Sequence, residues 1–596
     1  MIRSFCWDAK ILRVEGEVPW LMFRRNPKVL SAFRAEHFLF IGSASFCLLI
    51  LFLLAIVFWS TFQEGMPGTE TSLTVQNYRE VFLSGETYRA GFNSLIVAFG
   101  TVLLNLFFAV PAAWLIYRTN LPCKTFFITL MALGILIPGF LKGIAWILLL
   151  SPKVGLLNQF LRSFVPVEEG PLSIYNLGGI SFVQGLMLTP VMFFMCAAAF
   201  RAVDPQLEES AAVSGAPPAA VFCRITGPLI LPAIAGAAIY NFMTAVALFE
   251  IPALLGTTTR IQVLSTLMFY SVQASVGLPR YGIAGVYGVM LLFPSLVAVH
   301  YYQKLLRHGD RYSVISGRGY RPKLTDLGRW KYAGIAFLCG YLFLNLLLPF
   351  LVLIWTSLVP YIQLPSKAAL SSVTLEGYRR ALTTISGRPL VNTLLLVVCV
   401  PALVLFFSTI TSWIVVRTRL WGRRGVDAVV TLPMAIPHLA FAFALSYVGL
   451  YIASGVPIYG SLAAIIISHS IAFISFGSRT VNGTLIQIHK DLEEAVLVSG
   501  GSRLVALRRV VLPLLAPALF YAGVWVALLS YREVTMALFL QSPRNQVLST
   551  AIWNLWDSNN PADAAAMGVL MFFTVMFLLI AAQRGAKRFL YGMELR

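Results

Sequence analysis

The stretch Glu209-Ser-Ala-Ala-Val-Ser-Gly215 occurs a second time as Glu494-Ala-Val-Leu-Val-Ser-Gly500. The two copies are 285 residues apart (494 − 209), and the prolines Pro228 and Pro513 repeat the same offset (513 − 228). Both copies are short polar segments between apolar runs. An internal repeat is a strong indication of architecture and is weighed before other signals. The chain is therefore predicted to be a tandem duplication of one membrane unit.

Composition supports a membrane protein. Of the 596 residues, 58% are hydrophobic and only 12% are charged. A soluble protein of this length needs more charge to cover its surface. The net charge of +20 does not require nucleic acid, and none is expected as a partner, because polytopic membrane proteins concentrate Lys and Arg in cytoplasmic loops. The seven cysteines are scattered without CxxC spacing, so we expect neither a metal site nor a disulfide framework.

Twelve apolar runs have roughly the 20 residues that a helix needs to cross a bilayer. The predicted fold class is an all-α polytopic membrane protein with about twelve transmembrane helices in two parallel six-helix repeats. The expected spans of the first repeat are 37–62, 93–117, 125–151, 180–202, 229–255 and 282–302, and those of the second are 331–357, 391–417, 426–452, 460–480, 514–541 and 564–583.

The basic residues predict both the domain boundaries and the orientation. We expect a cytoplasmic N-terminal extension over 1–36, a first transmembrane domain over 37–302, a basic cytoplasmic linker over 303–330 and a second transmembrane domain over 331–596. Clusters of Lys and Arg precede the first span, fill the linker and close the chain, and twelve spans place all of them on one side. The positive-inside rule makes that side cytoplasmic, together with both termini and both repeated loops.

The repeated loop resembles the cytoplasmic "EAA" loop of binding-protein-dependent ABC importer permeases of the type I fold. The pattern of that family is Glu-Ala-Ala, three residues, Gly, nine residues, then Ile-x-Leu-Pro. This chain departs from the pattern mildly, with Ser210, Gly227 and Val496 at three of its positions. The resemblance implies a non-catalytic permease subunit in a bacterial inner membrane. The coupling residues that it implies are Glu208, Glu209, Ala211, Gly215, Pro228, Glu493, Glu494, Ala495, Gly500 and Pro513.

The residue types of the loop fit a short helix. Acidic residues stand in the expected first turn, where the helix dipole favours them. Gly215 and Gly500 stand where the helix should stop. Pro228 and Pro513 are expected in the first turn of the next membrane helix, where a missing N–H costs little. In the family, such a helix inserts into a groove of the ATP-hydrolysing subunit, where Glu209 and Glu494 would meet a basic residue. The alternative is a pair of surface loops retained from an old duplication.

The chain contains no Gly-x-x-x-x-Gly-Lys-Ser/Thr loop for ATP phosphates. We therefore expect no cofactor on this chain, and ATP with Mg²⁺ on a separate ABC ATPase, present in two copies for the two loops. The resemblance also implies a periplasmic or lipid-anchored substrate-binding protein. Its expected platform is formed by the outer loops 63–92, 152–179 and 358–390. Membrane lipid is the remaining partner.

Two carboxylates stand inside expected spans, where ionisable side chains are functional candidates. Glu250 and Glu533 follow their loop prolines by 22 and 20 residues (250 − 228 and 533 − 513), which predicts that both lie near the outer end of the membrane and face each other across a pathway. Such a pair would attract a cation, although Arg532 could neutralise one acid. Asn241 and His469 are further pathway candidates. The alternative for these polar residues is local pairing between helices.

Among permeases of this family, the chain resembles the fused twelve-span form that is usually assigned to ferric iron. The segments that carry this likeness are Glu250–Gly256 and Ser316–Pro322. Ferric iron prefers oxygen ligands, in line with carboxylates. Thiamine, polyamines and phosphonates are alternative cargoes for the same architecture. A secondary transporter with internal repeats and a membrane-embedded enzyme are the competing classes. Pro138 and Pro437 are expected to kink or break their spans, either for a gate or for packing alone.

Overall fold

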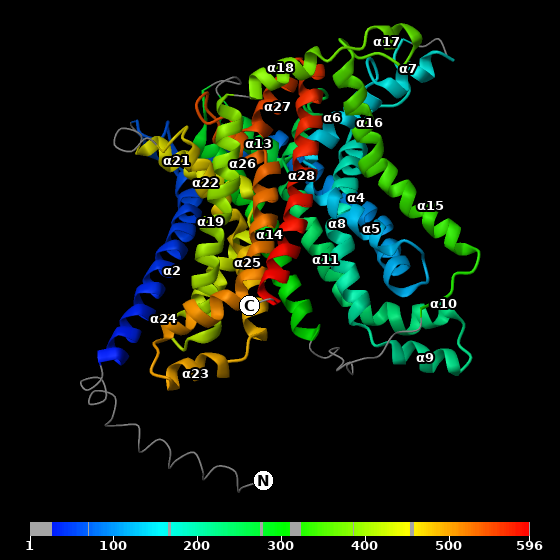
Figure 1. The fold of residues 1–596 in the computed structure, drawn as a ribbon. Helices are drawn as coiled ribbons and strands as arrows, with labels where there is room; N and C mark the ends of the chain where they lie inside the picture. Colours follow the sequence, from blue (N-terminus) through cyan, green and yellow to red (C-terminus); the bar gives the residue numbers. More distant parts are fainter. Residues whose placement is uncertain are drawn as a thin grey trace.

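The computed structural model describes residues 27–594, apart from 70, 165–167, 274–277, 310–323, 386 and 453–457. In this part of the chain, regular structure is almost entirely helical (Figure 1). The one sheet among these residues is a two-stranded antiparallel hairpin of β1 (Gln63–Glu64) and β2 (Ser72–Leu73). The predicted fold class, an all-α polytopic membrane protein, is confirmed. Most of the N-terminal extension and the Ser316–Pro322 segment lie outside the described residues.

The helices of the first half and of the second half follow the same order along the chain. The first half contains α2 (Pro27–Ser60), α3 (Gln76–Leu83), α4 (Gly85–Arg118), α5 (Lys124–Leu136), α6 (Gly139–Leu150), α7 (Leu156–Arg162), α8 (Leu177–Ala202), α9 (Pro205–Val213), α10 (Pro218–Val221), η1 (Phe222–Thr226), α11 (Gly227–Ala247), α12 (Glu250–Gly256), α13 (Leu264–Tyr270) and α14 (Tyr281–Gly309). The second half contains α15 (Trp330–Leu342), η4 (Phe343–Leu347), α16 (Leu348–Leu358), α17 (Lys367–Ser371), α18 (Glu376–Ile385), α19 (Arg388–Arg417), α20 (Arg423–Thr431), η5 (Leu432–Met434), α21 (His438–Tyr451), α22 (Leu462–Gln487), α23 (Asp491–Val498), α24 (Arg503–Ala506), η6 (Leu507–Val511), α25 (Leu512–Arg532), α26 (Thr535–Phe539), α27 (Leu548–Asp557) and α28 (Pro561–Glu594).

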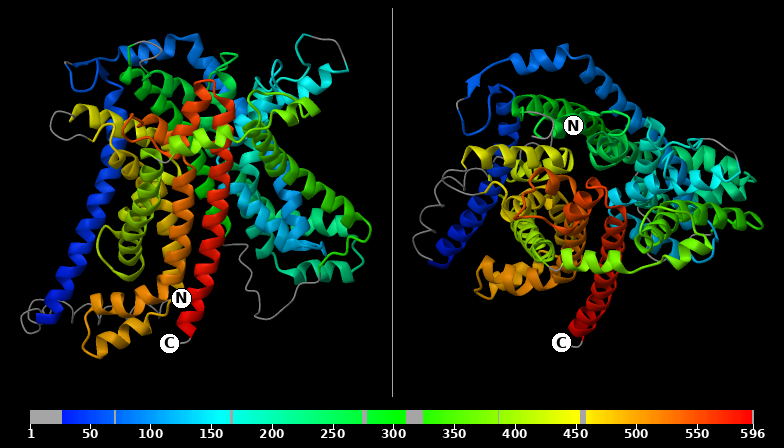
Figure 2. Two further views of the ribbon diagram at one scale, coloured as in Figure 1. Left: turned by 45° about the horizontal axis from the view of Figure 1, so that its top comes forward. Right: turned by 90° about the horizontal axis from the view of Figure 1, so that it is seen from above.

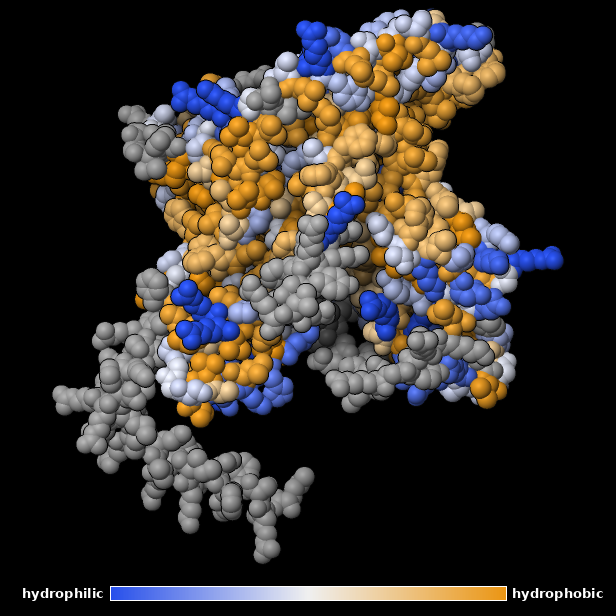
Figure 3. All heavy atoms as spheres, in the orientation of Figure 1, coloured by the Kyte–Doolittle hydropathy of each residue, from blue (hydrophilic) through white to orange (hydrophobic). Residues whose placement is uncertain are grey.

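The helices of the described residues account for every predicted span. Nine are long and apolar enough to cross a membrane, and two bent pairs raise that number to eleven. The twelfth predicted span, 282–302, corresponds to a shorter apolar segment, Tyr281–Val297. On the face drawn in Figure 3, a broad apolar band separates hydrophilic residues at the two ends of the molecule. Such a band is expected where side chains meet lipid.

Two predicted spans are broken rather than straight. The helices α5 and α6 meet at 93°, and the corresponding pair in the second half, the helical run Arg423–Met434 and α21, meets at 102°. Pro138 and Pro437 occupy the N-cap positions of the helices that follow the bends. A proline lacks the N–H that would continue a helix and pushes the preceding residue out of the helical region. The expectation that these prolines break their spans is therefore confirmed.

The helices that follow the repeated loops begin earlier than predicted. Helical structure starts at Pro218 and Arg503, about ten residues before Pro228 and Pro513. The prolines stand in the first turns of α11 and α25, as predicted, but each follows a five-residue π-helical segment, η1 or η6. A third π-helical segment, η4, precedes Pro349 in the same way. The i→i+5 pattern widens the helix just before a residue that cannot donate a backbone hydrogen bond, which accommodates the proline.

The first span of each half packs on the other half (Figures 1 and 2). The helix α2 contacts α19, α20 and α21, where Phe46 stacks on Phe407 with ring centroids 4.3 Å apart. The helix α15 contacts α4 and α5, and Tyr341 near its end donates a hydrogen bond to the Leu186 carbonyl of α8 at 3.1 Å. Contacts between helices therefore join the two halves that the sequence predicts.

Candidate functional site

The two repeated loops form short helices at one end of the molecule, on opposite sides of it (Figure 1). We call α9 and α23 the loop helices. The acidic residues Glu208, Glu493 and Glu494 stand in their first turns, as the helix dipole favours. The other predicted loop residues, Glu209, Ala211 and Ala495, lie in the same helices.

Both loop helices end at the predicted glycines. Gly215 and Gly500 have φ angles of +85° and +81°, a backbone region that residues with a Cβ rarely adopt. The next amide in each copy donates back to the helix, from Ala216 to the Ala211 carbonyl at 3.1 Å and from Gly501 to the Val496 carbonyl at 2.8 Å. This six-residue closure is the Schellman pattern of helix ends.

Replacing both terminal glycines tests this helix end. We expect Gly215→Ala with Gly500→Ala to destabilise the last turn of each loop helix by about 1–2 kcal/mol, because the left-handed backbone costs that much for a residue with a Cβ. Hydrogen exchange of the α9 and α23 amides should accelerate. Gly483→Ala, inside α22 and with free space around it, is the matched control and should not weaken its helix. Unchanged exchange in the double variant would contradict the assignment.

The loop helices expose apolar side chains at matching positions. Val213 is 89% exposed and Val498 is 90% exposed, and the two are 285 residues apart (498 − 213). Leu207 and Leu492 are exposed as well, at the same offset. Single exposed apolar side chains are ordinary, but a repeated set on two short helices outside the apolar band marks a surface that a partner would cover.

The first glutamate of each loop helix is held inside the protein. Glu208 lies 3.6 Å from the guanidinium of Arg118, and Glu493 lies 2.6 Å from that of Arg417. The second glutamate of each helix, Glu209 or Glu494, lies outside these ion pairs; Glu494 is exposed and Glu209 half-buried. The two arginines stand in a repeated sequence pattern, because Trp-x-x-x-Arg-Thr occurs at 114–119 and again at 413–418. The pattern does not show which residues the arginines contact.

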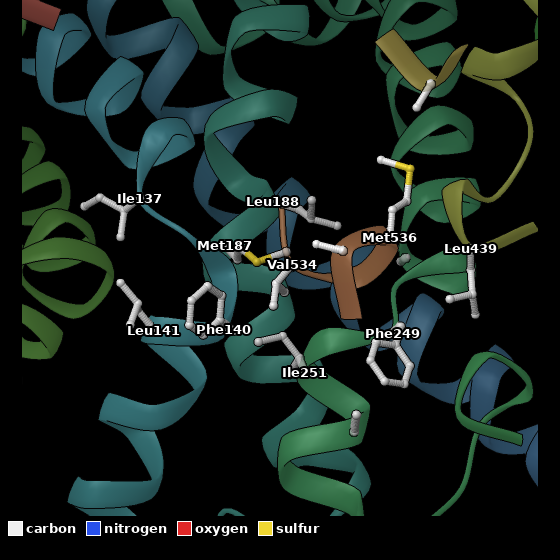
Figure 4. Packing of buried hydrophobic residues seen from close by; sticks show 14 of the residues in the cluster. Ile137, Phe140, Leu141, Met187, Leu188, Phe249, Ile251, Leu439, Val534 and Met536 are labelled. Carbon is white, nitrogen blue, oxygen red and sulfur yellow. The ribbon is translucent and has the colours of Figure 1, made fainter. Parts of the chain in front are cut away.

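A second candidate site is a cavity of about 210 Å³ between the two halves. Its walls come from α8, α11, the start of α12, the bends before α6 and α21, and the end of α25. Figure 4 shows buried apolar side chains of this region, and of those labelled, Met187, Leu188, Phe249, Leu439 and Val534 line the cavity. The ionisable residues that line the cavity are Glu250, His438, Arg532 and Glu533.

Glu250 and Glu533 both line the cavity, but they are not symmetry mates. At the offset of 285, Glu533 corresponds to Leu248 (533 − 285), and Glu250 corresponds to Thr535. The backbone agrees, because Leu248 and Glu533 end α11 and α25 with nearly the same angles, φ −68° and ψ 131° against φ −70° and ψ 128°. The acids also do not continue the long helices, as the predicted spans 229–255 and 514–541 required. They stand at the turns where those helices end.

Each charged group at the cavity also satisfies a helix end. Glu250 accepts a hydrogen bond from the Phe140 amide in the first turn of α6. Glu533 accepts hydrogen bonds from the Met536 amide at 3.0 Å, in the first turn of α26. Arg532 donates to the Ile135 carbonyl in the last turn of α5, so a side chain of the second half caps a helix of the first. Carboxylates at N-termini and cations at C-termini complement the helix dipole.

The other two pathway candidates occupy different places. His469 lies behind Glu533, with Nε2 3.2 Å from the carboxylate and Nδ1 2.8 Å from the Ser530 hydroxyl. Asn241 is buried among α4, α8 and α11, where it meets Asn105 at 3.4 Å, and it does not line the cavity. His438, which also lines the cavity, directly follows Pro437. Its place beside a helix-breaking proline is the sequence feature that could have identified it.

Among the described residues, no three His, Cys, Asp or Glu side chains are grouped so that they could hold a metal ion. The cavity therefore combines two carboxylates, one guanidinium and one imidazole without a preformed metal cage. Such a lining can attract a charged solute and release it again, because no set of ligands encloses it.

Comparison with known proteins places this architecture. Residues 405–589 match the family described as "Binding-protein-dependent transport system inner membrane component". The ferric transport system permease protein FbpB of Actinobacillus pleuropneumoniae is 25% identical over 563 residues, which cover 92% of this chain and 79% of that protein. The chain, called the permease from here on, is similar to type I ABC importer permeases. The permease is thus a multi-pass protein of a bacterial inner-membrane family, and it resembles ferric permeases over most of its length.

Two further relatives differ in the cargo that their names state. The Fe(3+)-transport system permease protein FbpB 2 of Haemophilus influenzae is 24% identical over 485 residues, covering 81% of the permease and 85% of that protein. The "Putative 2-aminoethylphosphonate transport system permease protein PhnV" of Salmonella typhimurium is 27% identical over 221 residues, covering 37% of the permease and 82% of that protein.

Proposed function

We propose that the permease forms the membrane pathway of an ATP-driven importer and is moved by two copies of a separate ABC ATPase, one on each loop helix. The observation that carries this proposal is the duplicated surface of α9 and α23, with Leu207 and Val213 in one copy and Leu492 and Val498 in the other. The end that bears the loop helices is cytoplasmic in this proposal, since Arg118, Lys124, Arg417 and Arg423 gather there. A periplasmic or lipid-anchored binding protein delivers the cargo at the opposite end.

The cargo that we propose is ferric iron. Relatives named as ferric permeases align with 92% and 81% of the chain, whereas the phosphonate relative aligns with 37%. Glu250 and Glu533 supply oxygen ligands of the kind that ferric iron prefers. An aminoalkylphosphonate is the second candidate, because the cavity also presents Arg532 and His438 to an anionic group. Uptake of labelled ferric iron and of 2-aminoethylphosphonate by cells with and without the permease distinguishes the two.

Capture of the ATPase tests the coupling part of the proposal. We expect the tagged permease to copurify with an ABC ATPase, and Val213→Asp with Val498→Asp to reduce that capture at least about tenfold, because a charge would be buried in each contact. Leu83→Asp is the matched control: Leu83 is 75% exposed at the end of α3, which makes no part of either loop helix, and its replacement should leave capture unchanged. Uptake by the purified chain without any ATPase would instead identify a secondary transporter.

A further inference from the structure

Two arginines tie the loop helices to the membrane helices. Arg118 is the last residue of α4, and its side chain is 7% exposed; Arg417 is the last residue of α19, and its side chain is 5% exposed. A buried guanidinium is retained only where its donors are well used. Both arginines donate from Nη2 to backbone carbonyls and pair with a glutamate at corresponding positions, although the Nε of each has no hydrogen-bond partner.

The first copy joins three elements. Arg118 donates from Nη2 to the carbonyl of Val203, the residue that ends α8, at 2.8 Å. Its Nη1 lies 3.6 Å from Glu208 in the first turn of α9. Glu208 in turn accepts a hydrogen bond of 2.5 Å from the hydroxyl of Thr226, just before α11. The end of α4, the end of α8 and the loop helix therefore meet at one side chain.

The second copy repeats the contacts of the arginine but not the hydroxyl hydrogen bond, because Val511 stands at the position of Thr226 (511 − 226 = 285). Arg417 donates from Nη2 to the carbonyls of Leu485 and Ile488, at 2.9 and 2.6 Å, where α22 ends. Its Nε lies 2.6 Å from Glu493. Ile488 corresponds to Val203, and Glu493 to Glu208, at the offset of 285 (488 − 203 and 493 − 208). The recurrence of a buried ion pair at corresponding positions in both copies indicates a shared task.

We propose that Arg118 and Arg417 are positioning residues that transmit movement of the loop helices to α4 and α19. This inference rests on the proposed docking of ATPase subunits at α9 and α23. A loop helix can move α4 or α19 only if a contact holds the two helices together. In each half, the arginine provides this contact, because it pairs with the loop glutamate and also binds the carbonyls at a helix end. The first glutamate of each loop thus works inside the permease.

The test uses the permease with its copurified ATPase in proteoliposomes, and the loaded binding protein as the stimulus. Arg118→Gln with Arg417→Gln should still capture the ATPase and retain basal ATP hydrolysis, but should lose at least about fivefold of the stimulation by the binding protein, as expected for a broken coupling. Glu208→Gln with Glu493→Gln should give the same loss, and all four changes together should add little, because each pair acts as one unit. Lysine at both arginine positions should restore part of the stimulation.

The matched control removes two other cations at the same helix ends. Lys124 and Arg423 donate to the carbonyls of Thr119 and Thr418 and make no ion pair with a loop helix, so Lys124→Gln with Arg423→Gln should leave stimulation intact. Normal stimulation in the arginine variant, or losses that sum in the fourfold variant, would overturn the inference. If the unmodified permease captured no ATPase, the proposed function itself would be overturned. This result differs from failure of the inference, which appears only in the variants while the unmodified permease still captures the ATPase.

Discussion

Reversing the charge of the second loop glutamates, Glu209→Lys with Glu494→Lys, should reduce ATP-driven uptake to background while the chain still inserts into the membrane. Residues one position apart on a helix point about 100° away from each other. Because Glu208 and Glu493 are turned inward to the arginines, we expect their neighbours Glu209 and Glu494 to meet the ATPase when it docks. A lysine there would face the basic residue that we expect on the ATPase, and like charges at an interface core repel strongly.

The matched control for this variant keeps the charge and shortens the side chain. Glu209→Asp with Glu494→Asp should retain most of the uptake, and each single Lys variant should fall between the control and the double variant. Uptake is measured in proteoliposomes, and membrane insertion is measured from the amount of purified permease. Full uptake by the double Lys variant would show that the partner does not contact these acids.

Replacement of Arg532 by methionine should lower the free energy of unfolding by about 1.5–3 kcal/mol, the value of a hydrogen bond that involves a charged group. The change removes the donor to the Ile135 carbonyl at the end of α5 and removes the cation beside Glu250 and Glu533. Two carboxylates then share the cavity without a compensating charge, so uptake should fall as well.

The appropriate measurement is thermal unfolding of the purified permease, with Arg532→Lys as the control that keeps the charge but cannot reproduce the planar guanidinium. Lysine should recover part of the lost stability. A methionine variant as stable as the unmodified permease would show that the contact between α5 and α25 contributes nothing. A stable variant with low uptake would assign Arg532 to the pathway alone.

The repeat was sufficient to predict the fold class and the location of the loop helices. Spacing and residue type identified Gly215 and Gly500 as helix ends because a left-handed backbone is a local property of one residue. The breaks at Pro138 and Pro437 were predictable for the same reason. The angles of those breaks were not, since they depend on the helices that pack around them.

The cavity was harder to predict from the sequence. Counting residues after the loop prolines assumed one straight helix, whereas α11 and α25 end at Ala247 and Arg532 and the chain turns there. The offset of 285 would have shown that Glu250 and Glu533 are not equivalent. Contacts between the halves, such as Arg532 with Ile135, follow only from the tertiary structure, because a hydrophobic pattern does not specify which neighbour a helix will contact.

The packing of α2 against α19 and of α15 against α4 has a consequence for how this protein could be divided. If the gene were split between the repeats, the first span of each product would lose its contacts with helices of the other product, although α16 would keep its packing on α28. The two products would have to associate to restore these contacts. The fused chain guarantees equal amounts of both halves. The helix contacts between the halves, and not only the peptide that joins them, hold the two halves together.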